Sequence, residues 1–285
     1  FLYISLIFLN HCSFDKKTGI WKKHNKEIIE RVKKTNVEKI FKSSKIFDEE
    51  IKSNRKISIL KSKKNLNWLE DNFSQNNSVS HLYYINNKNN IFKSKKIGKN
   101  SFTTVNTKPE PLIYKKNIFF SDLSGNIYKY SLDTRSLEWR FNFYKKKYKN
   151  LPKKINLKII SNSLIVSDNL GFFYKLNLDS GKIIWAKSQG VPLTSEIKSL
   201  NQKIFLLNQD NKFYIFEEST GKKILDFETF PVILKKNNKQ TLALDSRSNL
   251  YFVTSAGQIF SVNHQDYKIN WLKNIEDTGS TDEFG

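Results

Sequence analysis

The chain repeats one unit four times, and this repeat limits its possible folds more than any other feature. Each unit ends at a large hydrophobic residue, and successive ends lie 46, 40 and 46 residues apart: Trp139, Trp185, Leu225 and Trp271. Within each unit, small polar breaks separate four short alternating or apolar runs. A period of about 40 to 46 residues with four strands is typical of a β-propeller blade.

Two further columns agree between the units. Fourteen residues before each end stand residue types that accept a positive φ in a hairpin turn, namely Gly125, Gly171, Asn211 and Gly257. Eleven residues before each end stands an aromatic residue, in order Tyr128, Tyr174, Tyr214 and Phe260. In an ordinary β-sandwich, agreement between four segments at several aligned positions would arise only by chance. A repeated blade is therefore the better interpretation of the sequence.

The closing tryptophan of the unit is predicted to be a packing residue. We expect it to end the outer strand of its blade and to pack against the next blade, where a large flat ring buries much area. Leu225 in the same column supports this interpretation, because leucine can replace a packing residue but not a polar group.

The flanks of the repeat predict an incomplete ring. Residues before Gly125, with Trp68 and His81, predict a partial blade without the glycine-to-tryptophan spacing, and no closing strand follows Trp271. A propeller protects its strand edges by closing. We therefore expect an all-β fold over residues 65–285: a propeller of four-stranded PQQ-like blades, about four full blades plus one partial, truncated at the C-terminus.

The N-terminus predicts export. Residues 1–9 are apolar and uncharged, too short to span a bilayer and typical of the core of a signal peptide. Cys12 follows, with Ser13 after it, as at the lipidation site of a bacterial lipoprotein signal. Residues 1–12 are thus expected to be a signal-peptide remnant ending at the lipidated Cys12. The chain has no methionine, which indicates a truncated start.

Two observations leave an alternative open at this site. Asn10 and His11 stand where such a signal prefers small residues, and a buried cysteine ending a hydrophobic strand is the other interpretation of Cys12. Residues 13–64 are rich in lysine with scattered hydrophobic residues, and we expect a polar tether there.

The formal net charge of +22 does not indicate nucleic-acid binding. Lysine is in excess in every segment, together with Asn, Ile and Phe, the residue types that AT-rich codons specify. Base readout would be expected to use arginine, which is scarce in the repeats. We expect no nucleic-acid partner.

The stretch Asp168–Trp185 resembles the PQQ-type propeller repeat. Two groups share it: quinone-dependent dehydrogenases and the non-enzymatic propeller lipoproteins of outer-membrane barrel assembly (the BamB family). The order of lipoprotein cysteine, tether, NWLEDNFSQNN and KIGK is similar to the second group in AT-rich alphaproteobacteria. The resemblance implies a lipid-anchored scaffold on the periplasmic face of the outer membrane. Its implied partner is the barrel-inserting protein, and its implied role is to assist insertion of outer-membrane proteins.

An enzyme of the first group would need a Ca²⁺ site, a catalytic carboxylate and a vicinal cysteine pair. Cys12 is the only cysteine, and the four histidines lack metal-ligand spacing. The acidic residues that recur with the repeat are predicted to be turn residues: Asp122, Asp133, Asp168, Asp179, Asp210 and Asp245. We therefore expect no catalytic, cofactor or metal site.

Three questions stay open at this stage. A PQQ-dependent dehydrogenase with its active residues in further blades is one alternative, and a periplasmic ligand-binding propeller is another. The basic loops 145–154 and 234–240 are candidate contacts with acidic partners or lipid headgroups, or else solvated lysine-rich loops.

Overall fold

The computed structural model describes residues 58–85, 92–99, 110–144, 146–229, 240–245, 247 and 249–275. The chain divides into two compact units, Phe1–Ser58 and Ile59–Gly285, and the fold described below belongs to the second. Cys12, the signal-peptide remnant and most of the tether lie outside the described residues.

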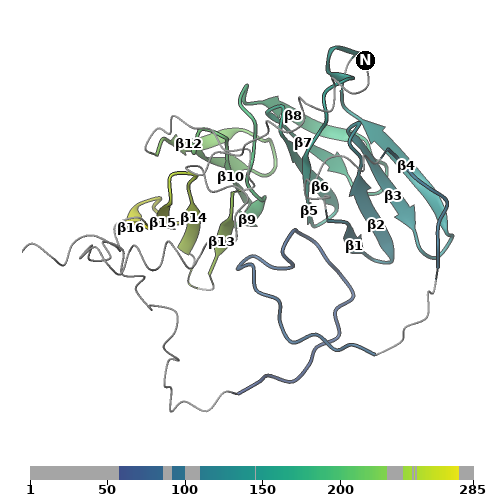
Figure 1. Cartoon of the computed structure of the whole chain (residues 1–285), viewed down its shortest axis with the longest axis horizontal. Coiled ribbons are helices and arrows are strands. Elements are labelled where there is room, and N and C mark those ends of the chain that lie inside the picture. Colours follow the sequence, from purple (N-terminus) through teal and green to yellow (C-terminus); the bar gives the residue numbers. More distant parts are fainter. Residues whose placement is uncertain are drawn as a thin grey trace, which may run out of the picture. The chain divides into compact units, whose positions relative to one another are not determined.

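The second unit contains four sheets of four antiparallel strands, each running up and down in chain order. We call them blades 1 to 4 (Figure 1). Blade 1 consists of β1 (Leu112–Tyr114), β2 (Asn117–Ser121), β3 (Asn126–Ser131) and β4 (Ser136–Asn142). A short 3-10 helix, η2 (Lys146–Tyr148), precedes blade 2, which consists of β5 (Ile155–Ile160), β6 (Ser163–Asp168), β7 (Phe172–Asn177) and β8 (Ile183–Ser188).

The other two blades repeat this order. Blade 3 consists of β9 (Lys198–Leu200), β10 (Lys203–Leu207), β11 (Phe213–Glu217) and β12 (Lys223–Phe227). Blade 4 consists of β13 (Leu242–Leu244), β14 (Asn249–Val253), β15 (Gln258–Asn263) and β16 (Ile269–Asn274). The predicted all-β propeller of four-stranded blades is therefore confirmed.

The first and last strands of each blade have different environments. The first strands, β1, β5, β9 and β13, have no exposed residue, and we call them the inner strands. The last strands, β4, β8, β12 and β16, are largely exposed, and we call them the outer strands. Every outer strand carries a β-bulge at an equivalent position, next to the closing residue of its repeat unit: Trp139, Trp185, Leu225 or Trp271.

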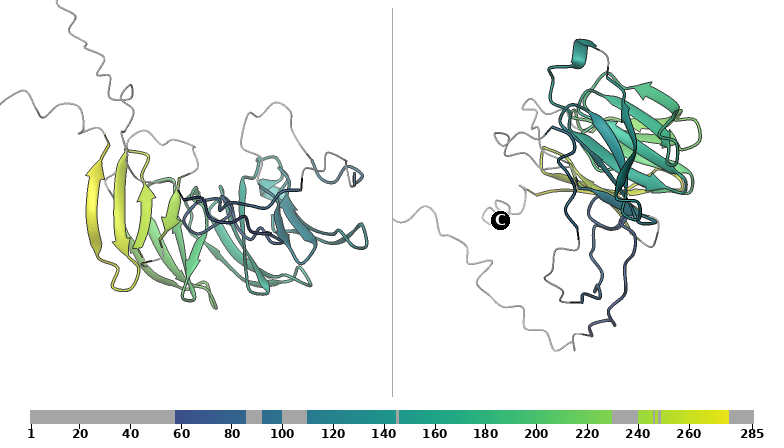
Figure 2. Two further views of the ribbon diagram at one scale, coloured as in Figure 1. Left: turned by 90° about the horizontal axis from the view of Figure 1, so that it is seen from below. Right: turned by 90° about the vertical axis from the view of Figure 1, so that its right-hand side faces the viewer.

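Neighbouring blades pack through aromatic and aliphatic side chains. Three buried clusters lie between blades 1 and 2, blades 2 and 3, and blades 3 and 4. In the second cluster the rings of Phe173 and Phe216 lie 4.8 Å apart, and in the third the stacked rings of Phe213 and Phe252 lie 5.2 Å apart. Figure 2 shows the sheets side by side in chain order. Burial of these faces is the main source of stability.

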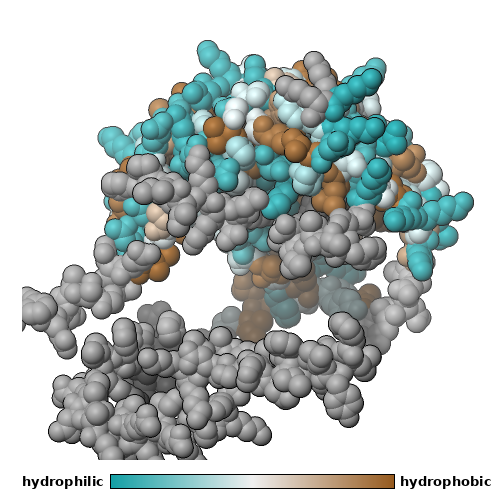
Figure 3. All heavy atoms as spheres, turned by 45° about the horizontal axis from the view of Figure 1, so that its top comes forward, coloured by the Kyte–Doolittle hydropathy of each residue, from teal (hydrophilic) through white to brown (hydrophobic). Residues whose placement is uncertain are grey.

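Ahead of β1 the described residues form isolated bridges rather than a fifth sheet. Lys63 and Leu82 make a parallel bridge, and Trp68 makes an antiparallel bridge with Ile113. On the face drawn in Figure 3, hydrophilic side chains surround separate hydrophobic ones. No helix in the described parts of the chain is long and apolar enough to cross a membrane.

Candidate functional site: a polar segment on the inner strands

Residues 67–78, which we call the inner segment, contact the inner strands of all four blades. Trp68 exchanges two backbone hydrogen bonds with Ile113 of β1, at 2.7 and 2.8 Å. The amide of Ile159 in β5 donates to Leu69 O at 2.8 Å. Gln75 reaches the last two blades: its side chain donates to the carbonyl of Ser199, and its own carbonyl accepts from the amide of Leu244. The inner segment therefore ties the four blades together at their inner ends.

Buried charges lie where this segment crosses blades 2 and 3. Lys158 and Lys198 occupy equivalent positions in β5 and β9, each paired with a core residue of the next strand. Glu70 of the inner segment forms ion pairs with both, at 2.8 Å to Lys158 Nζ and 3.2 Å to Lys198 Nζ. Glu196 lies 3.4 Å from Lys198 Nζ. All four side chains are at least nine-tenths buried, so water does not screen these pairs.

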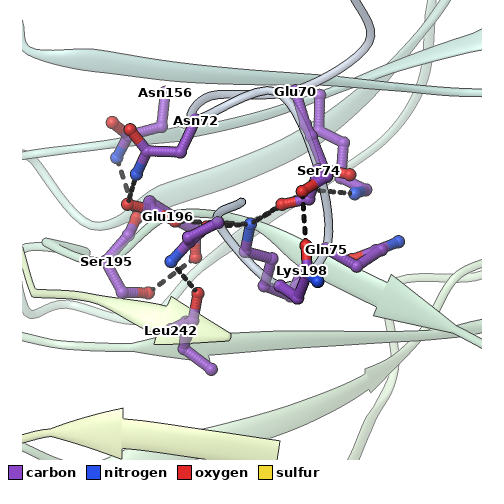
Figure 4. Close-up of polar contacts among 12 residues, drawn as sticks. Glu70, Asn72, Ser74, Gln75, Asn156, Ser195, Glu196, Lys198 and Leu242 are labelled. Carbon is purple, nitrogen blue, oxygen red and sulfur yellow. Dashed lines mark hydrogen bonds and ion pairs between the residues drawn. The ribbon is translucent and has the colours of Figure 1, made fainter. Parts of the chain in front are cut away.

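Lys198 is bonded to the inner segment at further atoms. Its ammonium donates to Ser74 O at 2.8 Å and to Asn77 Oδ1 at 2.6 Å. Asn72 donates to Glu196, and Figure 4 shows Ser74 and Glu196 beside the Lys198 side chain. An ammonium has three protons to donate, so these carbonyl and carboxylate acceptors satisfy it.

The charges in this site balance, and its groups are engaged with one another. Burial lowers the pKa of Lys158, while the adjacent Glu70 carboxylate acts in the opposite direction. A lysine with a lowered pKa is the type of group that acts as a nucleophile or base in enzymes. Here the Lys158 ammonium forms an ion pair with Glu70 at 2.8 Å, and the lysine side chain is only 3% exposed. The cluster thus connects the inner segment to blades 2 and 3 through buried ion pairs and hydrogen bonds.

Sequence reasoning missed this cluster. The lysine excess of the whole chain hides Lys158 and Lys198, and no sequence pattern singles out Glu70 or Glu196. The available signal was a lysine inside an apolar strand pattern, as in INLKII around Lys158, because lysine is almost never fully buried unless it is paired. Trp68, expected in a partial blade, lies on the inner segment instead, and His81 is exposed, with Nδ1 2.8 Å from Leu60 O.

The four turn residues of the repeat lie between the second and third strand of each blade. All have left-handed backbone: φ is 85° at Gly125, 84° at Gly171, 62° at Asn211 and 78° at Gly257. Three residues before each turn residue stands a residue whose side-chain oxygen accepts a hydrogen bond from a backbone amide two or four positions further along the chain. These acceptor residues are Asp122, Asp168, Asn208 and Thr254. In blade 3, Asn208 therefore occupies the position equivalent to Asp168, and Asp210 lies next to the turn residue Asn211.

The closing residues of the repeat lie within the outer strands, not at their ends. Trp139 is central in β4, and its indole nitrogen donates to Leu178 O of blade 2 at 3.1 Å. Trp185 of β8 donates in the same way to Glu218 O of blade 3, at 3.1 Å. Leu225 is partly buried in the cluster between blades 3 and 4. Trp271 of β16 remains 46% exposed.

A second buried acid joins blades 1 and 2 at the hairpin of blade 2. Asp168 is fully buried, and the Tyr144 hydroxyl donates to its Oδ2 at 2.5 Å. Burial raises the pKa of the Asp168 carboxyl, although Tyr144 and the amide of Phe172 donate to it and act in the opposite direction. Burial, together with the nearby Tyr174 and Asp168, also raises the pKa of Tyr144.

The Asp168→Asn variant tests this arrangement through pH. The raised pKa means that folded Asp168 holds its proton where the unfolded residue, with a pKa of about 3.9, has lost it. Its contribution to stability is therefore present below that unfolded pKa and lost as pH rises through the folded pKa. We expect urea denaturation at a series of pH values to show the variant gaining stability relative to wild type as pH rises from about 4. Asp133→Asn, at an exposed acid, is the matched control, and equal pH slopes in wild type and Asp168→Asn would contradict the assignment.

The described residues offer no acidic cluster for the calcium ion that a quinone cofactor would need. In the parts of the chain that the structure describes, no group of three or more His, Cys, Asp or Glu side chains could hold a metal ion. The sole cysteine, Cys12, cannot form a vicinal pair. The recurring Asp122 and Asp168 accept hydrogen bonds from their own turns, so they are not oriented as ligands.

No protein-family profile and no curated protein matches the sequence. Solved structures do match it. A europium-containing methanol dehydrogenase has a TM-score of 0.56 at 12% identity, over 73% of this chain and 48% of that one. A quinohemoprotein alcohol dehydrogenase from Comamonas testosteroni has a TM-score of 0.51 at 9% identity, over 59% of this chain and 35% of that one. BamB from Moraxella catarrhalis has a TM-score of 0.47 at 14% identity, over 55% of this chain and 49% of that one.

The chain thus spans 35% to 49% of the length of these three structures. At such low identity the likeness concerns the fold. The four sheets of four antiparallel strands agree with that likeness. The chain has the fold of a β-propeller with four-stranded blades.

Proposed function

We propose that this chain is the propeller of a non-enzymatic lipoprotein that serves as a scaffold in outer-membrane β-barrel assembly. It would be held at the periplasmic face of the outer membrane through Cys12. Its partner would be the barrel-inserting protein of the assembly machinery.

The observation that carries the non-enzymatic part of the proposal is the inner segment. It lies on the inner strands of all four blades, and its Glu70, together with Glu196, pairs with Lys158 and Lys198, two buried cations that could otherwise bind an anionic ligand. A small molecule could reach these lysines only by displacing hydrogen bonds that the chain makes with itself. The repeated aspartates are likewise engaged by their own turns.

The assembly role is supported by the order of features along the sequence. An apolar run precedes Cys12, a lysine-rich tether follows, and the propeller repeats come after it. A tethered propeller presents loops and outer strands as a docking surface, a geometry suited to binding other proteins.

The lipid anchor predicts labelling at a single residue. Growth with an alkyne palmitate analogue should label the full-length protein, and Cys12→Ala should abolish the label because no other cysteine is present. The neighbouring Ser13→Ala is the matched control and should keep it. Equal labelling of wild type and Cys12→Ala would contradict the anchor.

The assembly role is tested separately. Affinity purification of the tagged full-length protein from detergent-solubilised outer membranes should recover the barrel-inserting protein, with an unrelated tagged lipoprotein as control. Its absence under conditions that retain other assembly lipoproteins would contradict the role.

The alternative function is that of a PQQ-dependent dehydrogenase, since the two solved structures with the higher TM-scores are named as dehydrogenases. Incubation of the full-length protein with pyrroloquinoline quinone and Ca²⁺ tests it. Dye-linked alcohol oxidation above that of a heat-treated control would favour this alternative and contradict the scaffold.

A further inference from the structure

A lysine, an asparagine and a glutamate meet in the buried cluster where the inner segment crosses blade 3. Lys198 of β9 is fully buried, and its ammonium nitrogen lies 2.6 Å from Asn77 Oδ1 of the inner segment. The Glu196 carboxylate lies 3.4 Å from the same nitrogen, and its side chain is 3% exposed. The three groups are an amine, a carboxamide and a base, the reactants needed to join two side chains by an amide bond.

The side-chain amide of Asn77 is held in one orientation beside the lysine. Its nitrogen Nδ2 donates to Leu242 O of β13 at 2.9 Å, while Oδ1 accepts from Lys198. The backbone amide of Asn77 also donates to Ser74 O, at 3.0 Å. The carboxamide therefore stays beside Lys198 Nζ for as long as the inner segment lies on the blades, and such positioning replaces a collision between separate molecules.

Glu196 is the proton acceptor in this arrangement. Glu70, the other carboxylate near Lys198, also forms an ion pair with Lys158 at 2.8 Å, so that lysine still needs its charge. Glu196 accepts a hydrogen bond from Asn72 at Oε1, and Oε2 is the atom 3.4 Å from Lys198 Nζ. Glu196 can therefore take a proton from the ammonium without leaving Lys158 unpaired.

We propose that Lys198 Nζ and Asn77 Cγ join in an intramolecular isopeptide bond after the chain has folded. The ammonium gives one proton to Glu196, and the neutral amine attacks Cγ of Asn77. A second amine proton passes to Nδ2, the Cγ–Nδ2 bond breaks, and ammonia leaves. The products are a secondary amide, a protonated Glu196 carboxyl and one ammonia molecule, so atoms and charge balance. The reaction happens once in each chain and is not a turnover.

Two features of the cluster favour this reaction. Burying an ammonium and a carboxylate costs free energy that their attraction only partly offsets, and the reaction converts one such pair into neutral groups. Asn77 is only partly buried and lies between the exposed Asn76 and Ser78, so the ammonia can diffuse into solvent. Dilution of the ammonia then prevents the reverse reaction.

The bond fastens the inner segment to blade 3 and closes a covalent loop. The two linked residues are 121 apart in the chain, and the loop between them contains blades 1 and 2. Closing a long loop restricts the unfolded chain and so stabilises the folded one. A disulfide within this chain cannot do the same, because Cys12 is the only cysteine.

Mass spectrometry of the purified full-length protein tests the bond. We expect trypsin not to cleave after Lys198, and the peptides that carry Asn77 and Lys198 to appear as one branched product, lighter by one ammonia than their sum. Asn77→Ala and Lys198→Arg should each abolish this product. Asn76→Ala, at the exposed neighbour, is the matched control and should keep it.

Two further variants separate the chemistry from folding. Asn77→Asp offers a carboxyl group in place of the amide, so the same bond should form with loss of one water molecule instead of one ammonia. Glu196→Gln keeps the size of the side chain but cannot accept the proton, and formation of the branched product after refolding should slow by about 100-fold or more. A purely structural role of Glu196 would not change this rate in the protein that has folded.

Separate, unmodified Asn77 and Lys198 peptides after prolonged incubation of the folded wild type would overturn the proposal. So would loss of ammonia that persists in Lys198→Arg, because the nucleophile would then be another group. The bond should also raise the denaturation midpoint of the wild type above that of Asn77→Ala. Since Asn77→Ala keeps the ion pairs but cannot form the bond, adding Lys198→Met to it measures the ion pairs alone.

Discussion

The Lys198→Met variant is expected to lower the free energy of unfolding by about 3 to 5 kcal/mol, the range for breaking a buried ion pair from one side. Lys198 is fully buried, and its ammonium has partners on both Glu70 and Glu196. Methionine matches the length of the aliphatic chain but leaves Glu196 without its cation. It also removes the hydrogen bonds to Ser74 and Asn77 that hold the inner segment on β9. Urea denaturation with an unchanged m-value measures the loss.

The control for this variant is a lysine in an exposed pair. Lys116 lies 3.1 Å from Asp133, and both side chains are more than half exposed, so Lys116→Met should cost less than about 1 kcal/mol. Adding Glu196→Gln to Lys198→Met should recover part of the loss, because it removes the buried charge left behind. A loss from Lys198→Met no larger than that of Lys116→Met would show that the cluster is not a stabilising joint.

The Trp185→Ala variant is expected to cost about 3 kcal/mol, at the lower end for removing a large aromatic residue because the ring is only partly buried. The indole packs against Phe173, with ring centres 4.8 Å apart, and against Gly221 of the next blade. Its truncation leaves a void between blades 2 and 3, and it leaves the Glu218 carbonyl with only the longer hydrogen bond from Lys175, at 3.4 Å. The denaturation midpoint should fall accordingly.

Trp271→Ala is the matched variant, because the same column residue has no following blade in the described structure. Trp271 is 46% exposed, so its removal should cost about 1 kcal/mol or less. Equal losses at Trp185 and Trp271 would contradict the view that the tryptophan contributes mainly through the neighbouring blade.

The repeat could be predicted from the sequence because it rests on local chemistry. Turns that need left-handed backbone select glycine or asparagine, as at Gly171 and Asn211, and strands select alternating apolar residues. These requirements recur in every blade and are written in short windows of sequence. The position of each tryptophan within its strand was wrong by a few residues, because strand ends depend on pairing rather than on propensity.

The cluster on the inner strands could not be predicted in the same way. Glu70 lies 88 residues before Lys158 and 128 before Lys198, and no local pattern relates them. Lysine also dominates the whole chain, so two structural lysines were hidden among many solvated ones. Their roles follow from burial, which is a property of the assembled sheets.

The sequence by itself therefore determined the blade, its turns and the column of closing residues, since each is set by interactions between residues close in the chain. Only the tertiary structure decided which blade each tryptophan meets, which glycine must make room for it, and which charges the inner segment neutralises. These depend on long-range contacts, where the physical requirement is complementarity of volume and charge between surfaces far apart in sequence.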